Sequence, residues 1–254
     1  MHQRIILIET STSLCSVALA ENGVIVASRR SSEPRAHAAM TAPYVKEILD
    51  ERGLRVSDCD AVCLSMGPGS YTGLRVGSST AKGLCFGGGI PLLAVGTLDV
   101  LVAQALEEGL PEGCRYIVPM IDARRMEVYT AVYATDGQRL TDVAPVVVEG
   151  IGSVFCSPEG GSLSPPATKT PGVFKVGETL PPSGEGILFI GDGAAKCEPV
   201  LAAPGRWFRQ ECPTAEAMKE PALRELNAGN FRDIAYFEPF YLKEFVATVG
   251  KKLF

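Results

Sequence analysis

The segment GPGSYTGLRVG, Gly67 to Gly77, has the composition of a loop that binds phosphate. It contains three glycines and a proline within seven residues, after an apolar run and before a helical pattern. Its first glycines, Gly67, Gly69 and Gly73, have the spacing GxGxxxG, one residue longer than the dinucleotide-binding GxGxxG. It also lacks the GK[ST] ending of a Walker A loop, and the next apolar run, PLLAVGT, lacks the acidic residue of a dinucleotide site. The segment is therefore a poor match to both nucleotide motifs.

The helix predicted after this loop gives another reason for small residues. Gly73, Gly77 and Ala81 recur every four residues, so they share one face of a helix. Glycine inside a helix costs roughly 0.5–1 kcal/mol relative to alanine, so such a face needs a structural reason. Small residues at this spacing let another helix approach closely. The neighbour is either a helix of a partner subunit or an element of this chain, and we favour the partner.

A carboxylate and several hydroxyl groups follow the first predicted strand. The turn reads ETST, and its serine stands where phosphate-binding turns of the pattern DxGx[TS] have glycine. Later in the chain GDGAAK precedes a predicted helix, whose N-terminal N–H groups favour anions. An aspartate ends the apolar run YIVPMID. Together these residues predict a weak site for ATP or ADP between two lobes, comprising Glu9, Thr10, Ser11, Asp122, Gly191 and Asp192.

Other catalytic sites are excluded by the inventory of residues. With two histidines in the chain a His-rich metal site is excluded, and there is no GxSxG motif of a serine hydrolase. The eight cysteines include no CxxC pair, so we expect buried reduced thiols. Asp122, Arg124 and Glu127 form either an active-site carboxylate set or an ion-pair network between lobes. We expect no catalytic residue, no metal site and no required cofactor.

The net charge and hydropathy of the chain limit the partners that it can bind. The net charge is −5 and basic residues do not cluster beyond short pairs, which argues against strong independent binding of nucleic acid. No apolar run approaches the roughly 18 residues that a membrane span needs. The short apolar run near the start is interrupted by Glu9, unlike a signal peptide. We therefore expect a cytoplasmic protein without a membrane anchor.

The first part of the chain predicts three strands followed by alternating helices and strands. RIILIET, LCSVALA and VIVAS are apolar runs, and Asn22-Gly23 between the last two predicts a hairpin. Helices are expected at 37–52, from Ser70 or Thr72 to about 85, and at 97–108 with Thr97 as its cap, with strands AVCLSM and IPLLAV between them. This β-β-β-α-β-α-β-α order is typical of the ribonuclease H-like half of actin, sugar kinases and Hsp70.

The second part repeats this pattern in reduced form. YIVPMID, MEVYTAVYAT, LTDVAPVVVE and ILFIGDG predict strands, and helices are expected at 194–201 and 215–228. We predict an α/β protein with the two-lobed actin-like (ASKHA) fold, made of tandem ribonuclease H-like lobes of which the second is reduced. The expected boundaries are residues 1–110 and 111–254, with a poorly ordered Pro/Gly-rich insertion at about 156–186.

Several segments together resemble the bacterial TsaB (YeaZ) family. They are ILIETSTSLCSVAL, RAH at 35–37, GPGSYTGLRVG with AKGL, PLLAVGTLDVL, IDARRMEVY and EPFYLKE. The resemblance covers nearly the whole chain except the insertion, and GPGSYTGLR is highly specific to that family and its paralogue TsaD. It implies a non-catalytic accessory subunit, required to form N6-threonylcarbamoyladenosine at adenosine 37 of tRNAs that read ANN codons. The ETST turn departs from the more usual Asp-Thr beginning.

The resemblance also implies partners and an interface. TsaD holds a metal through an HxxxH motif, and the matching segment TLDVLVAQALEEG has no histidine. The implied partners are a TsaD-type paralogue and a TsaE-type ATPase, with a homodimer when the chain is alone. The implied interface comprises His37, Met40, Thr41, Tyr44, Tyr71, Arg75, Gly77 and Ser78, to which the small-residue face adds Gly73 and Ala81.

An alternative function stays open at this point. The same fold superfamily includes small-molecule kinases and acyltransferases. Such an enzyme would use Glu9, Asp122 and Asp192 around Mg-ATP. The missing glycine in the ETST turn favours the accessory subunit over the enzyme.

Overall fold

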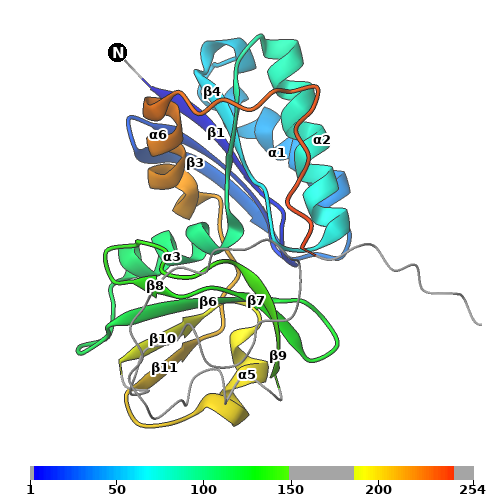
Figure 1. The fold of residues 1–254 in the computed structure, drawn as a ribbon. Helices are drawn as coiled ribbons and strands as arrows, with labels where there is room; N and C mark the ends of the chain where they lie inside the picture. Colours follow the sequence, from blue (N-terminus) through cyan, green and yellow to red (C-terminus); the bar gives the residue numbers. More distant parts are fainter. Residues whose placement is uncertain (1–2, 149–185, 243–254) are drawn as a thin grey trace, which may run out of the picture.

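The chain forms two lobes, each built on one β-sheet (Figure 1). The structure, a computed structural model, describes residues 3–148 and 186–242. The Pro/Gly-rich insertion expected at about 156–186 lies outside the described residues except for Gly186.

The sheet of the first lobe has five strands in the order β3-β2-β1-β4-β5. β1 pairs antiparallel with β2 and parallel with β4, which pairs parallel with β5. The predicted hairpin turn is confirmed, because Asn22 and Gly23 have φ of 52° and 78°. The strands are β1 (Arg4–Glu9), β2 (Cys15–Glu21), β3 (Val24–Ser31), β4 (Ala61–Ser65) and β5 (Leu92–Val95).

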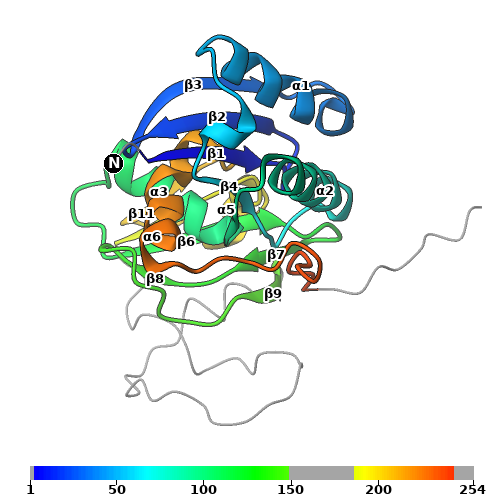
Figure 2. The ribbon, with the colours of Figure 1, turned by 90° about the horizontal axis from the view of Figure 1, so that it is seen from above.

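Helices cover both faces of this sheet, because alternate residues of its buried strands are apolar on each side. Ile6 and Ile8 of β1 pack toward α1 and α2, whereas Ile5 and Leu7 pack toward α6. Figure 2 shows α1 and α2 on one side of the sheet and α6 on the other. The helices are α1 (Ala36–Asp50), η1 (Val56–Asp58), α2 (Tyr71–Gly88), η2 (Glu216–Met218) and α6 (Lys219–Ala228).

The second lobe has a sheet in the order β11-β10-β6-β7-β9, with β8 paired to β6. α5 packs on one face, and α3 packs on the other, where it lies between the lobes (Figure 1). The elements are α3 (Thr97–Glu108), β6 (Tyr116–Asp122), β7 (Glu127–Thr130), β8 (Tyr133–Ala134), β9 (Ala144–Val147), β10 (Ile187–Ile190), α5 (Ala194–Leu201) and β11 (Arg206–Arg209).

The predicted α/β fold class with two lobes is confirmed. The expected boundary at residue 110 assigns all later residues to the second lobe, but some residues near the end of the chain pack in the first lobe. Ala215, Met218 and Ala222 pack in the core of the first lobe with Ile5 and Leu7. The chain therefore returns from the second lobe to the first, because the apolar face of the first sheet needs a cover.

The segment after α6 also belongs to the first lobe. We call residues 230–242 the C-terminal strap; it runs along α2 toward the second lobe (Figure 1). The backbone N–H of Arg232 donates to the carbonyl of Leu92 at 2.8 Å, and that of Phe240 to the carbonyl of Met66 at 2.7 Å. The strap is thus bonded to the lobe near both of its ends.

Two local predictions differ from the structure. The expected strand MEVYTAVYAT is two strands, β7 and β8, and Thr97 is the first residue of α3 rather than its cap. The hydroxyl of Thr97 instead bonds to that of Ser65 at 2.8 Å. The α2 cap is Ser70, whose Oγ accepts from the Gly73 N–H at 3.4 Å.

The state of the cysteines and the length and apolar character of the helices can be read from the structure. The seven described cysteines are free thiols, and Cys156 lies outside the described residues. Within the described part of the chain, none of the helices combines the length and the apolar character that crossing a membrane requires.

Candidate functional site

The predicted nucleotide residues meet where the two lobes face each other. β1, β4 and β5 are parallel, so their carboxyl ends share one edge of the first sheet, and the ends of β6 and β10 share one edge of the second. The two edges face each other, because Asp192 after β10 acts electrostatically on Glu9 at the end of β1. We call this region the lobe junction.

Glu9 is the most perturbed carboxyl group of the junction. It is fully buried, and its Oε1 accepts a hydrogen bond from the Ser11 N–H at 2.6 Å. Burial raises the pKa of Glu9 to about 7, although the hydrogen bond from the Ser11 N–H opposes the rise. Its Oε2 and the hydroxyls of Ser11 and Thr12 are buried without a hydrogen-bond partner. The junction therefore holds a largely desolvated acid near neutral pKa.

The second lobe contributes two aspartates and a lysine. Burial raises the pKa of Asp192, whose Oδ1 accepts from the backbone N–H of Asp122 at 2.8 Å. Burial also acts to raise the pKa of Asp122, but bonds from Lys196 and from the Arg124 N–H lower it overall. Asp122 and Lys196 form an ion pair within the second lobe. The predicted cluster around Asp122 is thus an internal ion pair rather than a bridge between lobes.

Backbone N–H groups of these two loops are bonded within the protein. In a phosphate-binding loop the backbone N–H groups point at the ligand. Here the Ser11 N–H is taken by Glu9, the Gly193 N–H by the carbonyl of Met120 at 3.0 Å, and the Ala195 N–H by Gln210 at 2.7 Å. The structure brings the six predicted residues to one junction, but their loops are bonded internally.

The small-residue face of α2 packs against the same turn of the chain. A Cβ added at Gly73 or Gly77 would lie closer than 3.0 Å to Thr10, and one at Gly69 would lie that close to Ser11. The Thr10 hydroxyl also donates to the carbonyl of Gly73 at 2.9 Å. The glycines therefore allow α2 to approach the β1–β2 turn.

This contact corrects part of the predicted interface. Gly73, Gly77 and Ala81 are buried within the first lobe, so the prediction that they are kept small for a partner helix is wrong. Thr41 and Ser78 are also buried, at 1% and 6% exposure. These five residues are thus buried by the chain itself in the folded lobe.

The other predicted interface residues lie at least partly on the surface. His37, Met40 and Tyr44 of α1 and Tyr71 of α2 are half-buried, and Arg75 is exposed. The Arg75 guanidinium lies over the Tyr71 ring, 4.4 Å from its centroid. Their role in binding a partner stays a prediction.

An outward face of α2 escaped the sequence analysis. Ser79, Gly83 and Gly87 are exposed at four-residue spacing, and a Cβ at either glycine would meet no atom within 4 Å. Phe86 on the same side is 86% exposed, and Tyr236 of the strap is 85% exposed. The four-residue spacing was a usable signal, but α2 carries two such series and spacing alone does not tell which one faces outward.

Two surface hollows lie away from the junction residues. One, of about 450 Å³, is lined by residues of α3 and α6 that include Asp99 and Arg224. The other, of about 510 Å³, lies beneath the strap between Met66 and Tyr241. Neither hollow contains a residue of the predicted nucleotide site.

The chain is similar to proteins of one family. The model of the family described as TsaD, tRNA N6-adenosine threonylcarbamoyltransferase, matches residues 25–243. The chain is 38% identical over 133 residues to the tRNA threonylcarbamoyladenosine biosynthesis protein TsaB of Escherichia coli, a match that covers 52% of this chain and 56% of that protein. It is 32% identical over 142 residues to the Bacillus subtilis protein of the same name, covering 56% and 59% of the two chains. The chain thus spans little more than half the length of the curated relatives it matches.

Similar solved structures cover the chain more fully. YeaZ from Pseudomonas aeruginosa superposes with a TM-score of 0.71 at 27% identity, covering 94% of this chain and 99% of that one. A second crystal structure, described as an uncharacterized protein with similarity to peptidase YeaZ from Pseudomonas aeruginosa, has the same TM-score and identity. It covers 95% of this chain and 100% of that one, so both lobes are included in the similarity.

Proposed function

This chain belongs to the family described as TsaD, tRNA N6-adenosine threonylcarbamoyltransferase, and from that membership we propose that it acts in forming threonylcarbamoyladenosine in tRNA. The names of its TsaB relatives support this pathway. The modified nucleoside is N6-threonylcarbamoyladenosine at position 37 of tRNAs that read ANN codons. Because tRNA is the substrate, we place this role in the cytoplasm.

Within the pathway we propose a non-catalytic accessory subunit. The observation that carries this is the internal bonding of both junction loops, in which Glu9 and Gln210 take N–H groups that a bound phosphate would need. α3 contains no histidine, and the described residues hold no group of three side chains suited to a metal ion. These observations support a subunit that needs no nucleotide or metal of its own.

The same bonding argues against the alternative function. A small-molecule kinase or acyltransferase would need Glu9, Asp122 and Asp192 ionised around Mg-ATP. In this chain burial raises the pKa of both Glu9 and Asp192, and Asp122 is paired with Lys196. Ionising the buried Glu9 is unfavourable near neutral pH, and Asp122 is already engaged by Lys196, which disfavours a magnesium site here.

The partners of the subunit follow from the exposed faces of α1 and α2. We propose that a TsaD-type paralogue binds there, and that a second copy of the chain occupies the same face when the paralogue is absent. The face combines the half-buried Met40 and Tyr44 with the outward residues Ser79, Gly83 and Phe86. Small residues without nearby atoms let a partner helix approach closely. A TsaE-type ATPase then joins the pair.

Reconstitution tests this function. TsaD-type, TsaE-type and TsaC-type proteins of the same organism are combined with tRNA, threonine, bicarbonate and ATP, with and without this chain. We expect modified adenosine, measured by mass spectrometry of digested tRNA, to require the chain. Equal modification without the chain would exclude the accessory role. Modification by this chain without the TsaD-type protein would show instead that the chain is the catalyst.

A further inference from the structure

The structure presents a group of arginines at one side of the lobe junction. We propose that these residues, Arg35, Arg75, Arg124 and Arg125, bind the phosphate backbone of the tRNA while the chain is held in its complex. We call them the arginine rim. The proposal rests on the role in tRNA modification and adds to it the surface that contacts the substrate.

The tip of the β6–β7 hairpin has an unusual backbone. Arg124, Arg125 and Met126 have φ of 63°, 47° and 57°, the left-handed region that L-amino acids other than glycine rarely adopt. Three such residues in a row rarely persist unless the surrounding structure determines them. The conformation directs two consecutive arginines outward from one turn.

Hydrogen bonds on both sides of the tip hold this conformation. The Ala123 N–H donates to the carbonyl of Glu127 at 3.0 Å, and the Glu127 N–H donates to the carbonyl of Arg124 at 2.9 Å. The Val148 N–H donates to the carbonyl of Met126 at 2.7 Å, which ties the tip to the end of β9. The arginines therefore stand on a fixed support, and less conformational entropy is lost when they bind.

The guanidinium groups of the tip are available to a ligand. Both side chains are exposed, and within the described ranges neither forms an ion pair with a carboxylate closer than 4 Å. The neighbouring carboxylate, Asp122, is already bound by Lys196 and by the Arg124 N–H. Among the described residues, therefore, neither Arg124 nor Arg125 has its guanidinium group occupied by a salt bridge, although Arg124 interacts electrostatically with Asp122.

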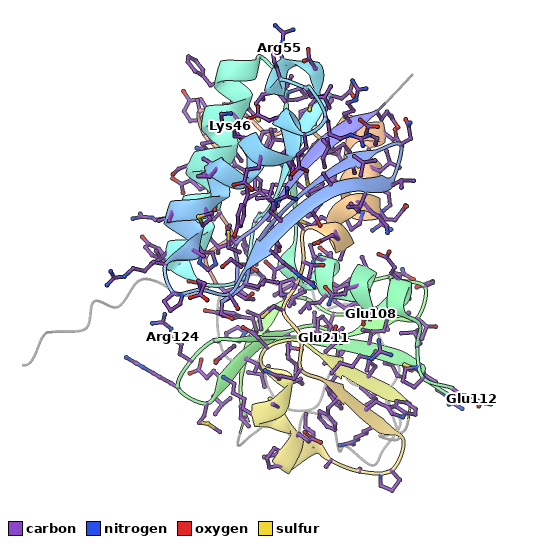
Figure 3. The ribbon with its side chains drawn as sticks, turned by 180° about the vertical axis from the view of Figure 1, so that it is seen from behind. Lys46, Arg55, Glu108, Glu112, Arg124 and Glu211 are labelled. Carbon is purple, nitrogen blue, oxygen red and sulfur yellow. The ribbon has the colours of Figure 1, made fainter. Side chains whose placement is uncertain are left out.

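The first lobe adds positive charge at the same side of the junction. Figure 3 shows Arg124 directly below the ends of α1 and α2 that face the second lobe. Because β3 and β4 both end at that edge, these are the N-terminal ends of the two helices. The helix dipole makes such ends positive, and neither helix has an acidic residue in its first turn.

Two arginines stand at these helix ends. Arg35 directly precedes α1 and Arg75 lies in the second turn of α2; both are exposed and, among the described residues, neither has a carboxylate partner within 4 Å. Even with the exposed Glu33 two residues before Arg35, the rim has an excess of positive charge.

The distribution of charge favours RNA over an acidic protein. The whole chain carries a net charge of −5, so a polyanion is repelled from most of its surface and drawn to the rim. The four arginines lie on three separate elements of two lobes, an arrangement suited to successive phosphates of an extended backbone. The planar guanidinium group matches a phosphate in two hydrogen bonds. The rim then supplements binding by the partner subunit, as the absence of a large basic face requires.

Binding of tRNA to the complex with the TsaD-type protein tests the proposal. Fluorescence anisotropy with labelled tRNA is measured over a series of salt concentrations. The double variant Arg124→Ala with Arg125→Ala should bind at least about fivefold more weakly and lower the slope of log affinity against log salt by about 1.5. The variant Arg124→Lys with Arg125→Lys keeps the charge and should retain most of that slope.

A matched control removes two positive charges far from the rim. Lys46 and Arg55 lie in the upper part of the first lobe, away from Arg124 (Figure 3), and Lys46→Ala with Arg55→Ala should leave affinity and slope near those of the wild type. Equal binding by the tip variant and the wild type would overturn the proposal, as would a wild-type complex that does not bind tRNA. Dissociation of the tip variant from the TsaD-type protein, seen by light scattering, would show a protein contact instead and also overturn it. Failure of reconstitution to need the wild-type chain would be a separate result, against the proposed function itself.

Discussion

At the scale of single residues, the carboxyl group of Glu9 makes the stability of the folded protein depend on pH. Its pKa is about 7 in the folded protein, against an ordinary value of 4.5. The folded state therefore holds this proton more tightly than the unfolded state does. The stability that this group contributes is fully present below about pH 4.5 and is lost as the pH rises through about 7.

The substitution Glu9→Gln should remove this dependence, because glutamine keeps the shape and cannot ionise. At pH 8 the variant should be more stable than the wild type by up to about 3 kcal/mol, and at pH 4.5 the two should be close. Urea unfolding at both pH values measures the difference. A wild type and variant with the same change between the two pH values would show that Glu9 is solvated in the folded protein.

Replacing glycines on the two faces of α2 should have opposite effects on the stability of the protein. Gly73→Ala places a Cβ against the backbone oxygen of Thr10 and should destabilise the protein by about 1–3 kcal/mol. Gly83→Ala meets no atom within 4 Å and should stabilise it by roughly 0.5–1 kcal/mol, through helix propensity alone. Thermal and urea unfolding of the matched pair measure both effects. Similar changes in the two variants would contradict the contact with Thr10.

Residue types were predictable from the sequence here, but their surroundings were not. The sequence identified Glu9 and the glycines as unusual because a carboxylate after a buried strand and glycines inside a helix both need a reason. Whether the Ser11 N–H points to a ligand or to Glu9 depends on a backbone geometry that no spacing encodes. The predicted nucleotide residues therefore came together in space, but with the N–H groups of Ser11 and Ala195 bonded within the protein.

At the scale of elements, we expect the outward face of α2 to be the surface through which the chain binds a second copy or the TsaD-type protein. Ser79→Arg places a long charged side chain on this face without disturbing the helix, since arginine is a good helix former. We expect the variant to remain folded by circular dichroism but to lose self-association and binding to the TsaD-type protein, measured by light scattering. Ala228→Arg is the control, because α6 covers the opposite face of the sheet. Unchanged association of the Ser79 variant would exclude this face.

Elements with a strong period were predicted well, and short ones were not. α1, α3 and the first hairpin follow from helical spacing and from Asn22-Gly23. β11, the sequence RWFR, was missed because four half-buried residues show no alternation of apolar and polar side chains. Its strand conformation comes from pairing with β10, a contact that local sequence does not specify.

At the scale of the whole molecule, contacts between the lobes predict cooperative unfolding. The hydroxyls of Ser65 in β4 and Thr97 in α3 share a hydrogen bond of 2.8 Å, and Lys219 of α6 forms an ion pair with Glu107 of α3. Trp207, the single tryptophan, reports on the second lobe. We expect its fluorescence and the far-ultraviolet circular dichroism to change at the same urea concentration. An earlier change in fluorescence would mean that the second lobe unfolds independently.

The division into lobes could be predicted, but the path of the chain between them could not. The repeated order of strands and helices identifies two sheets. An amphipathic helix such as α6 shows that it covers an apolar face, not which sheet that face belongs to. Its position became known from the packing of Ala222 with Ile5 and Leu7, more than 200 residues earlier in the chain.

This return of the chain sets an order for folding during synthesis. The ribosome releases the strands of the first sheet early, but α6, which covers one face of that sheet, emerges some 200 residues later. Until then the side chains of Ile5 and Leu7 lack the part of their cover that Ala215, Met218 and Ala222 provide, and such exposed apolar surface is prone to aggregate. The packing of this face of the first sheet is therefore completed only after the second lobe has been synthesised.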